Sequence, residues 1–99
     1  MTTDLVVAET QLLLARRIGP ASAHDFTRRM FARPERIVWN DGPTTTEALA
    51  WLDRFSDRPL SLTDAVSFAV MDRRGIREAF SFDRDFEDAG FAMMPDWRR

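Results

Sequence analysis

Residues 61–86, SLTDAVSFAVMDRRGIREAFSFDRDF, constrain the fold more than any other part of this chain. Ser61 before a long apolar run predicts a capped and largely buried helix, and Gly75 predicts its end in a left-handed conformation. The aromatic composition of residues 78–82 is typical of a buried strand. Aspartates follow that strand at its carboxyl end, where open α/β sheets bind their ligands. The segment therefore predicts a helix–strand unit that presents carboxylates at one edge of a sheet.

Helical and strand patterns alternate along the rest of the chain. Apolar periodicity and stop signals predict helices over 4–18, 22–32 and 44–55, strands over 36–40 and 91–94, and a short turn or helix over 85–89. Such alternation is typical of an α/β fold with a parallel sheet covered by helical layers. The length of 99 residues predicts a single domain over 1–99.

In the third predicted helix, a capping pattern and apolar spacing suggest where it begins and which face is buried. Thr44 and Glu47 have the spacing of a capping box, which predicts that the helix begins at Thr44. Leu49, Leu52 and Phe55 recur at helical spacing, so we expect them to point into the core.

Composition excludes several classes of function. The chain has no cysteine and no lysine, which excludes disulfides, thiolate metal sites and a phosphate loop that depends on lysine. Its single histidine, His24, excludes an acid–base ribonuclease mechanism that uses two histidines. No apolar run approaches the roughly 18 residues of a membrane-spanning helix, and the net charge of −2 leaves RNA contacts to local arginine clusters.

Three acidic residues, Glu9, Asp64 and Asp83, are flanked by apolar residues inside a predicted helix or strand or at its end. Leucines lie one helical turn before and after Glu9, which places Glu9 inside the apolar stripe of its helix. Asp64 falls in the first turn of its helix, and Asp83 follows a strand. Each has a structural alternative: Glu9 as a salt-bridge partner of Arg16, Asp64 as a helix cap, and Asp83 as a turn residue.

A cluster of carboxylates suits a hard divalent cation. Neighbouring carboxylates repel one another, and a bound cation relieves that repulsion. Mg²⁺ and Mn²⁺ prefer oxygen ligands, and in hydrolases they activate water and stabilise a leaving oxygen. The sequence therefore favours a metal-assisted hydrolase if the three acids meet in space.

The order of these motifs resembles the PIN domain family, especially the small bacterial VapC-type toxins. The resemblance rests on a helix with Glu9, the S-L-T-D-A helix ending R-R-G-I, and F-S-F-D-R-D-F. It implies a three-layer α/β/α fold with a parallel sheet, and metal-dependent cleavage of RNA phosphodiesters. By motif, it implies that Glu9, Asp64 and Asp83 bind Mg²⁺ or Mn²⁺. Asp85 is a secondary candidate ligand, and Ser81 and Arg84 would lie beside the site.

The resemblance also implies partners. Besides an RNA substrate, VapC-type toxins bind a VapB-like antitoxin, and we expect a homodimer in the cytoplasm with no membrane association. Trp97, in the polar tail, is a candidate for such a protein interface. Phe80, Phe82, Phe86 and Phe91 are expected in the core rather than on an RNA-stacking surface.

The chain departs from the family pattern at its start. PIN domains open with a strand that carries their first aspartate, and no such segment occurs in these 99 residues. We therefore expect an N-terminally truncated PIN domain with an incomplete metal site and impaired cleavage. Two alternatives stay open: an inactive remnant that binds only an antitoxin or itself, and a small α/β domain whose acids are caps and salt bridges.

Overall fold

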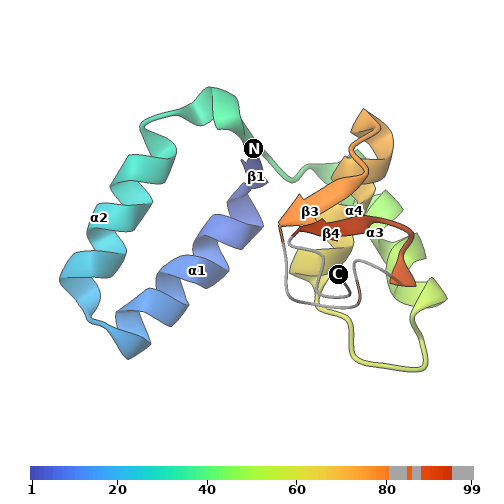
Figure 1. Cartoon of the computed structure of the whole chain (residues 1–99), viewed down its shortest axis with the longest axis horizontal. Helices are drawn as coiled ribbons and strands as arrows, with labels where there is room; N and C mark the ends of the chain where they lie inside the picture. The colour runs from blue at the N-terminus through green and yellow to red at the C-terminus, as the bar shows by residue number, and fades with distance from the viewer. Residues whose placement is uncertain (81–84, 86–87, 95–99) are drawn as a thin grey trace. The chain divides into compact units, whose positions relative to one another are not determined.

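The computed structural model describes residues 1–80, 85, 88–94, and these form two compact units, Met1–Gly42 and Pro43–Arg99 (Figure 1). Each unit is described by itself. The elements of the first unit are β1 (Thr2–Thr3), α1 (Asp4–Arg17), α2 (Pro20–Phe31), a 3₁₀ turn (Pro34–Arg36) and β2 (Ile37–Val38). Those of the second are α3 (Gly42–Arg54), which starts at the boundary, α4 (Leu62–Arg74), β3 (Glu78–Phe80) and β4 (Ala92–Met94).

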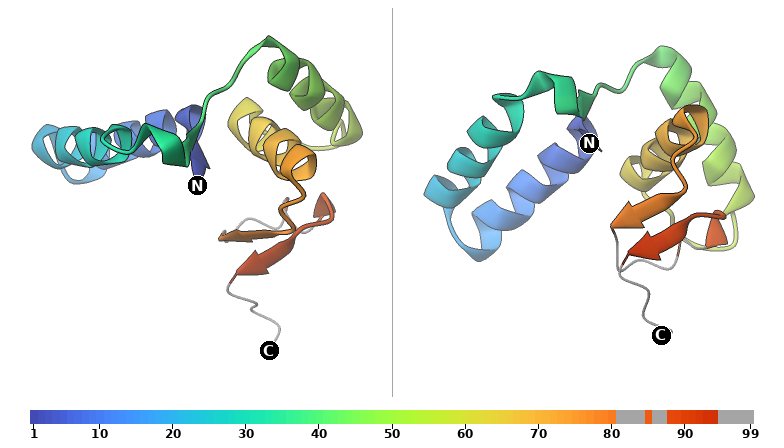
Figure 2. Two further views of the ribbon diagram at one scale, coloured as in Figure 1. Left: turned by 90° about the horizontal axis from the view of Figure 1, so that it is seen from above. Right: turned by 45° about the horizontal axis from the view of Figure 1, so that its top comes forward.

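Helices α1 and α2 form an antiparallel hairpin in the first unit, as all the views show (Figures 1 and 2). The Thr3 hydroxyl accepts a hydrogen bond from the Val6 amide at 3.2 Å, which caps the start of α1. Gly19 then adopts a φ of 144°, a value that L side chains disfavour, and Pro20 opens α2. The Gly-Pro pair therefore ends one helix and begins the next.

Strands β1 and β2 pair in parallel at the open end of this hairpin, with Thr2 opposite Ile37 and Thr3 opposite Val38. Two residues are too few to show an alternating pattern, so β1 was not predicted, and β2 is shorter than the predicted strand over 36–40. Beyond β2, the Asn40 amide donates to the Asp4 carboxylate at 2.9 Å. The pairing and this hydrogen bond join the two ends of the unit.

An aromatic cluster forms the core of the second unit. Trp51, Phe55, Phe68 and Phe91 are buried, and their rings contact one another at centroid distances of 5.3–6.4 Å. Trp51 lies in α3, Phe55 directly follows α3, Phe68 lies in α4 and Phe91 directly precedes β4, so one cluster joins both helices to the strand pair. The expected core role of Phe91 is confirmed, whereas Phe82, Phe86 and Trp97 lie outside the described residues.

Helix α4 has the caps that the sequence predicts. The Ser61 hydroxyl accepts from the Asp64 amide at 3.0 Å. At the other end Gly75 has a φ of 68°, and the Ile76 amide donates to the Met71 carbonyl at 2.8 Å. Most of the helix between these caps is buried, including Val66, Phe68, Ala69 and Val70.

The predicted start of α3 is wrong, and its predicted inner face is right for Phe55 but wrong for Leu49. The helix begins at Gly42, so Thr44 lies inside its first turn and the Thr44–Glu47 pair is no capping box. Proline at position 43 suits a first turn because its missing amide has no partner there. Glu47 instead forms an ion pair with Arg73 of α4 at 2.9 Å.

The buried stripe of α3 consists of Thr44, Ala48 and Trp51, and buried Phe55 follows directly after the helix. Leu49 is 51% exposed and Leu52 is half-buried. The indole of Trp51 is the largest apolar side chain on the helix. Its contacts with Phe68 and Phe91 select the face that turns inward, rather than the leucines.

The α/β class and the parallel strand pairing are confirmed. Among the described strands, β1–β2 and β3–β4 are separate two-stranded parallel sheets, with Glu78, Ala79 and Phe80 opposite Ala92, Met93 and Met94 in the second. No helix in the described ranges is long and apolar enough to cross a membrane.

Candidate active site

Asp64 is the best-positioned of the predicted acids. It is half-buried in the first turn of α4, where its amide is bound to the Ser61 hydroxyl. The positive end of the helix dipole at this turn favours a negatively charged side chain. The buried residues Thr63, Ala65 and Val66 surround it in the sequence and hold this turn in the core of the unit. A rigid helix terminus therefore positions the carboxylate.

Glu9 is exposed on α1, which contradicts its predicted place on the inner face. Val7 is the buried residue of α1, and Glu9 lies about 200° farther around a helix of 3.6 residues per turn. Leu12 and Leu13, the leucines that suggested an inner face, are exposed as well. Glu9, Leu12 and Leu13 share a face of α1, but that face is exposed.

The proposed ion pair of Glu9 with Arg16 is also wrong. Within the part of the chain that the structure describes, neither side chain forms an ion pair. The Glu9 carboxylate is therefore accessible, as a metal ligand must be.

Asp83, Ser81 and Arg84 lie outside the described residues, so their roles stay predictions. Helical backbone is present at Asp85 and Asp88, and the Ala89 amide donates to the Asp85 carbonyl at 3.0 Å. This agrees with the predicted turn or helix over 85–89.

The Asp85 carboxylate is bound by arginine. The Arg58 guanidinium contacts Asp85 at 3.1 Å and Asp88 at 2.5 Å, and it lies 5.3 Å from the centre of the Phe55 ring. The hydrogen bonds that Arg58 donates to Asp88, and then to Asp85, raise the pKa of Arg58 above its ordinary value, so the guanidinium stays charged. Asp85 has a 17% exposed side chain and already has a cationic partner.

Sequence reasoning missed this role of Arg58. The partners lie 27 and 30 positions later, a separation at which no local pattern pairs two charges. The structure assigns Arg58 to joining the end of α3 to the turn before β4.

The described residues contain no group of three or more histidine, cysteine or acidic side chains that could hold a metal. Glu9 belongs to the first unit and Asp64 to the second. The donor set itself, carboxylates only, fits Mg²⁺ or Mn²⁺ and excludes softer metals that need sulfur or several imidazoles.

Comparison with known proteins identifies the fold family. The family model described as PIN domain matches residues 1–92. The chain belongs to the PIN domain family.

This PIN domain is similar to characterised relatives over most of its length. It is 38% identical over 94 residues to the 23S rRNA-specific endonuclease VapC20 of two strains of Mycobacterium tuberculosis, CDC 1551 / Oshkosh and H37Rv. The matches cover 95% of this chain and 72% of each relative. The crystal structure of M. tuberculosis VapC20, titled a sarcin-ricin loop cleaving toxin, superposes with a TM-score of 0.82 and 37% identity, covering 91% of this chain and 69% of that one. The predicted resemblance to VapC-type PIN domains is confirmed.

Proposed function

We propose that this PIN domain is a metal-dependent endoribonuclease of the VapC toxin type. The observation that carries the proposal is its 38% identity to a 23S rRNA-specific endonuclease over 95% of the chain. The structure supports it through the half-buried Asp64 at the capped start of α4.

Glu9, Asp64 and Asp83 are the residues that would hold Mg²⁺ or Mn²⁺. When bound, the ion would supply an activated water and offset the charge that develops on the phosphodiester. The chain's own contribution is positioning: the Ser61 cap orients the first turn of α4, and the positive end of the helix dipole there favours a negatively charged side chain.

Structured RNA is the substrate class that we propose, by analogy with the ribosomal loop that VapC20 is titled as cleaving. A VapB-like antitoxin and a second copy of the chain are the proposed protein partners. We place the protein in the cytoplasm, where such a substrate occurs.

The activity of these 99 residues alone is expected to be weak. The chain contains three of the four acids implied by the family pattern, so a bound ion would lack one carboxylate ligand. A second candidate function is partner binding without catalysis. The exposed apolar side chains of Leu12 and Leu13 in α1 and of Ile18 directly after it favour it, because exposed apolar side chains are available to protein partners.

Cleavage of a stem-loop RNA in Mn²⁺, measured together with Mn²⁺ binding by calorimetry, tests the proposal. Asp64→Asn and Glu9→Gln should each lower the cleavage rate by on the order of 100-fold and weaken Mn²⁺ binding, since a metal ligand is lost. Asp53→Asn, which removes an exposed carboxylate from α3, is the matched control and should leave both unchanged.

Two results would contradict the nuclease proposal. Cleavage that survives Asp64→Asn would show that the carboxylate is no ligand. A wild-type chain that neither binds Mn²⁺ nor cleaves RNA, but associates with a partner, would establish the non-catalytic alternative.

A further inference from the structure

Two aromatic rings stack on the surface of the first unit. Phe31 at the end of α2 and Trp39 after β2 lie 5.5 Å apart between ring centroids, with an angle of 18° between their planes. Phe31 is 37% exposed and Trp39 is 53% exposed. Large aromatic side chains in a core would be covered, so this pair presents a flat apolar surface to solvent.

The backbone holds this pair in place on both sides. Val38, immediately before Trp39, pairs with Thr3 in the β1–β2 ladder, and Asn40, immediately after it, donates to Asp4 at 2.9 Å. Phe31 is part of α2 itself. The stack is therefore preorganised, which reduces the entropy cost of binding a flat ligand.

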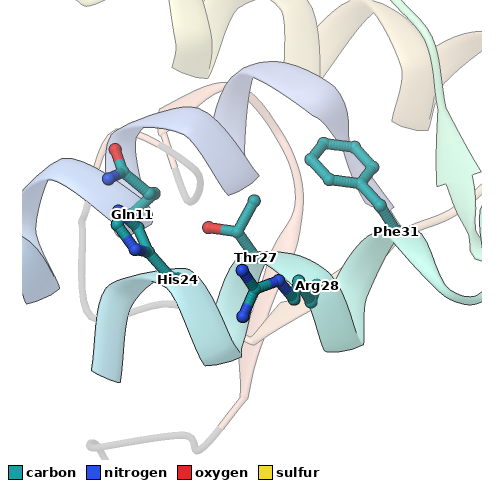
Figure 3. Close-up of a pocket in the computed structure, with 5 residues that line it drawn as sticks. All are labelled: Gln11, His24, Thr27, Arg28 and Phe31. Atoms are coloured by element: carbon teal, nitrogen blue, oxygen red, sulfur yellow. The ribbon is translucent and has the colours of Figure 1, made fainter. Parts of the chain in front are cut away.

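Phe31, one ring of the stack, also lines a cavity of about 500 Å³. Figure 3 shows the side chains that line it. Gln11 of α1 lines it together with His24, Thr27, Arg28 and Phe31, which lie on one face of α2. This volume lies within the roughly 300–1,000 Å³ of small-ligand sites. The cavity thus combines an aromatic wall with side chains able to form hydrogen bonds.

The polar groups of the cavity are available to a ligand. The Thr27 hydroxyl donates to the Ala23 carbonyl at 2.8 Å and keeps its acceptor capacity. In the described part of the chain, the side chains of Gln11, His24 and Arg28 form no hydrogen bond or ion pair. An amide, an imidazole and a guanidinium can together bind the edge of a base and a phosphate.

The charge around the stack favours a polyanion. Residues 28–39 carry four arginines against a single glutamate, an excess of three positive charges in a chain whose net charge is −2. Arg29 is paired with Asp25 at 2.9 Å, whereas Arg28, Arg33 and Arg36 form no ion pair among the residues described. A protein partner selected only for apolar contact would not require this local excess.

From these observations we infer that the Phe31–Trp39 stack and the adjoining cavity bind an unpaired nucleotide of RNA. The base stacks on the aromatic pair, Gln11 and His24 contact its edge, and Arg28 contacts its phosphate. The inference rests on the proposed RNA substrate and adds a binding site that contains none of the candidate metal ligands. Single-stranded nucleic acids are commonly bound by this combination of aromatic rings and cations.

Binding of a fluorescent, unstructured RNA 12-mer to the full chain in EDTA, followed by anisotropy, tests the site without cleavage. Trp39→Ala and Phe31→Ala should each weaken binding by roughly 10-fold, because a stacking surface is lost. Trp39→Phe, which keeps a ring, should retain most of the affinity and guards against a folding artefact. Leu49→Ala, which removes an exposed apolar side chain from α3, should leave the RNA affinity unchanged.

The charge contribution is tested by salt titration. Arg28→Gln should lower the slope of log affinity against log salt by about 1, as expected for one lost phosphate contact. Arg17→Gln removes an exposed arginine from α1 and is the charge-matched control. Equal effects of the two variants would show general electrostatic attraction and would overturn the site.

The outcomes separate this inference from the nuclease proposal. Stacking-dependent RNA binding by a chain that cleaves nothing would support the site and refute the nuclease. If Phe31→Ala and Trp39→Ala leave both RNA cleavage and RNA affinity unchanged, the binding-site inference is refuted and the nuclease proposal stands. Unchanged RNA affinity with a dimer lost in Trp39→Ala would assign the surface to a second copy of the chain.

Discussion

The two units differ in how they use their apolar side chains. Among the described residues of Pro43–Arg99, the large aromatic side chains Trp51, Phe55, Phe68 and Phe91 are buried and contact one another. Met1–Gly42 leaves its largest ones in solvent, including Leu12, Leu13, Ile18, Phe31 and Trp39, and buries mainly small or β-branched residues such as Val7, Ala23 and Ile37.

This difference indicates a division of roles. Buried aromatic area is the main source of stability in a small domain, so the second unit supplies the stable framework. Exposed aromatic and aliphatic side chains are available for partners, so the first unit supplies recognition surface. The candidate acids follow the same division, with Glu9 on an exposed helix and Asp64 at the edge of a core helix.

The largest effect is expected from the centre of the aromatic cluster. Phe68→Ala should lower the free energy of unfolding by about 3–5 kcal/mol, because it leaves a cavity where three rings meet. Leu13→Ala, in the exposed stripe of α1, should change it by less than about 0.5 kcal/mol. Urea denaturation followed by circular dichroism measures both, and similar losses for the two variants would refute the contrast.

Helix caps should produce an intermediate effect that is present in both units. Ser61→Ala and Thr3→Ala each remove a hydroxyl that accepts an amide, and each should cost about 1 kcal/mol. Thr3 is also buried, so its loss should be the larger of the two. Urea denaturation measures the cost, and hydrogen exchange should show faster opening at the first turn of the affected helix only.

Ser22→Ala is the control for the caps, since it alters an exposed serine near the start of α2. It should leave stability within about 0.5 kcal/mol of the wild type. If Ser22→Ala lowers the free energy of unfolding as much as Ser61→Ala, the cap hydrogen bond does not account for the loss.

The smallest effect is expected at Arg58. Its ion pairs with Asp85 and Asp88 are partly exposed and screened by salt, so Arg58→Gln should destabilise the fold less than Ser61→Ala. The difference between variant and wild type should shrink when urea titrations are repeated in 1 M NaCl. A loss that is large and independent of salt would show that Arg58 acts through packing on Phe55 instead.

Local signals predicted the elements whose ends have specific chemistry. Ser61 and Gly75 act within a few residues of their own position, and each has its predicted role at an end of α4. The capping box at Thr44 failed because Gly42 and Pro43 start the helix earlier, and both patterns are compatible with the same residues. A local capping pattern is therefore reliable where no other helix-start signal lies within a few residues of it.

Burial was predicted less well than helix ends. Helical spacing selected Leu49 of α3 for the core, and it placed Glu9, Leu12 and Leu13 on the inner face of α1, yet all four are exposed. Periodicity shows that apolar residues share a face, but not whether another element covers that face. In α3, the packing of Trp51 against Phe68 determines which face of the helix is buried.

The sequence by itself determined the α/β class, the caps, the place of Asp64 at a helix terminus and the likeness to VapC-type PIN domains, because these depend on neighbouring residues and motif order. Only the tertiary structure decided which faces are buried, which strands pair, that Arg58 binds Asp85, and that Phe31 stacks on Trp39 beside a cavity. These features join residues that are distant in the chain, and their partners are selected by packing and charge in three dimensions.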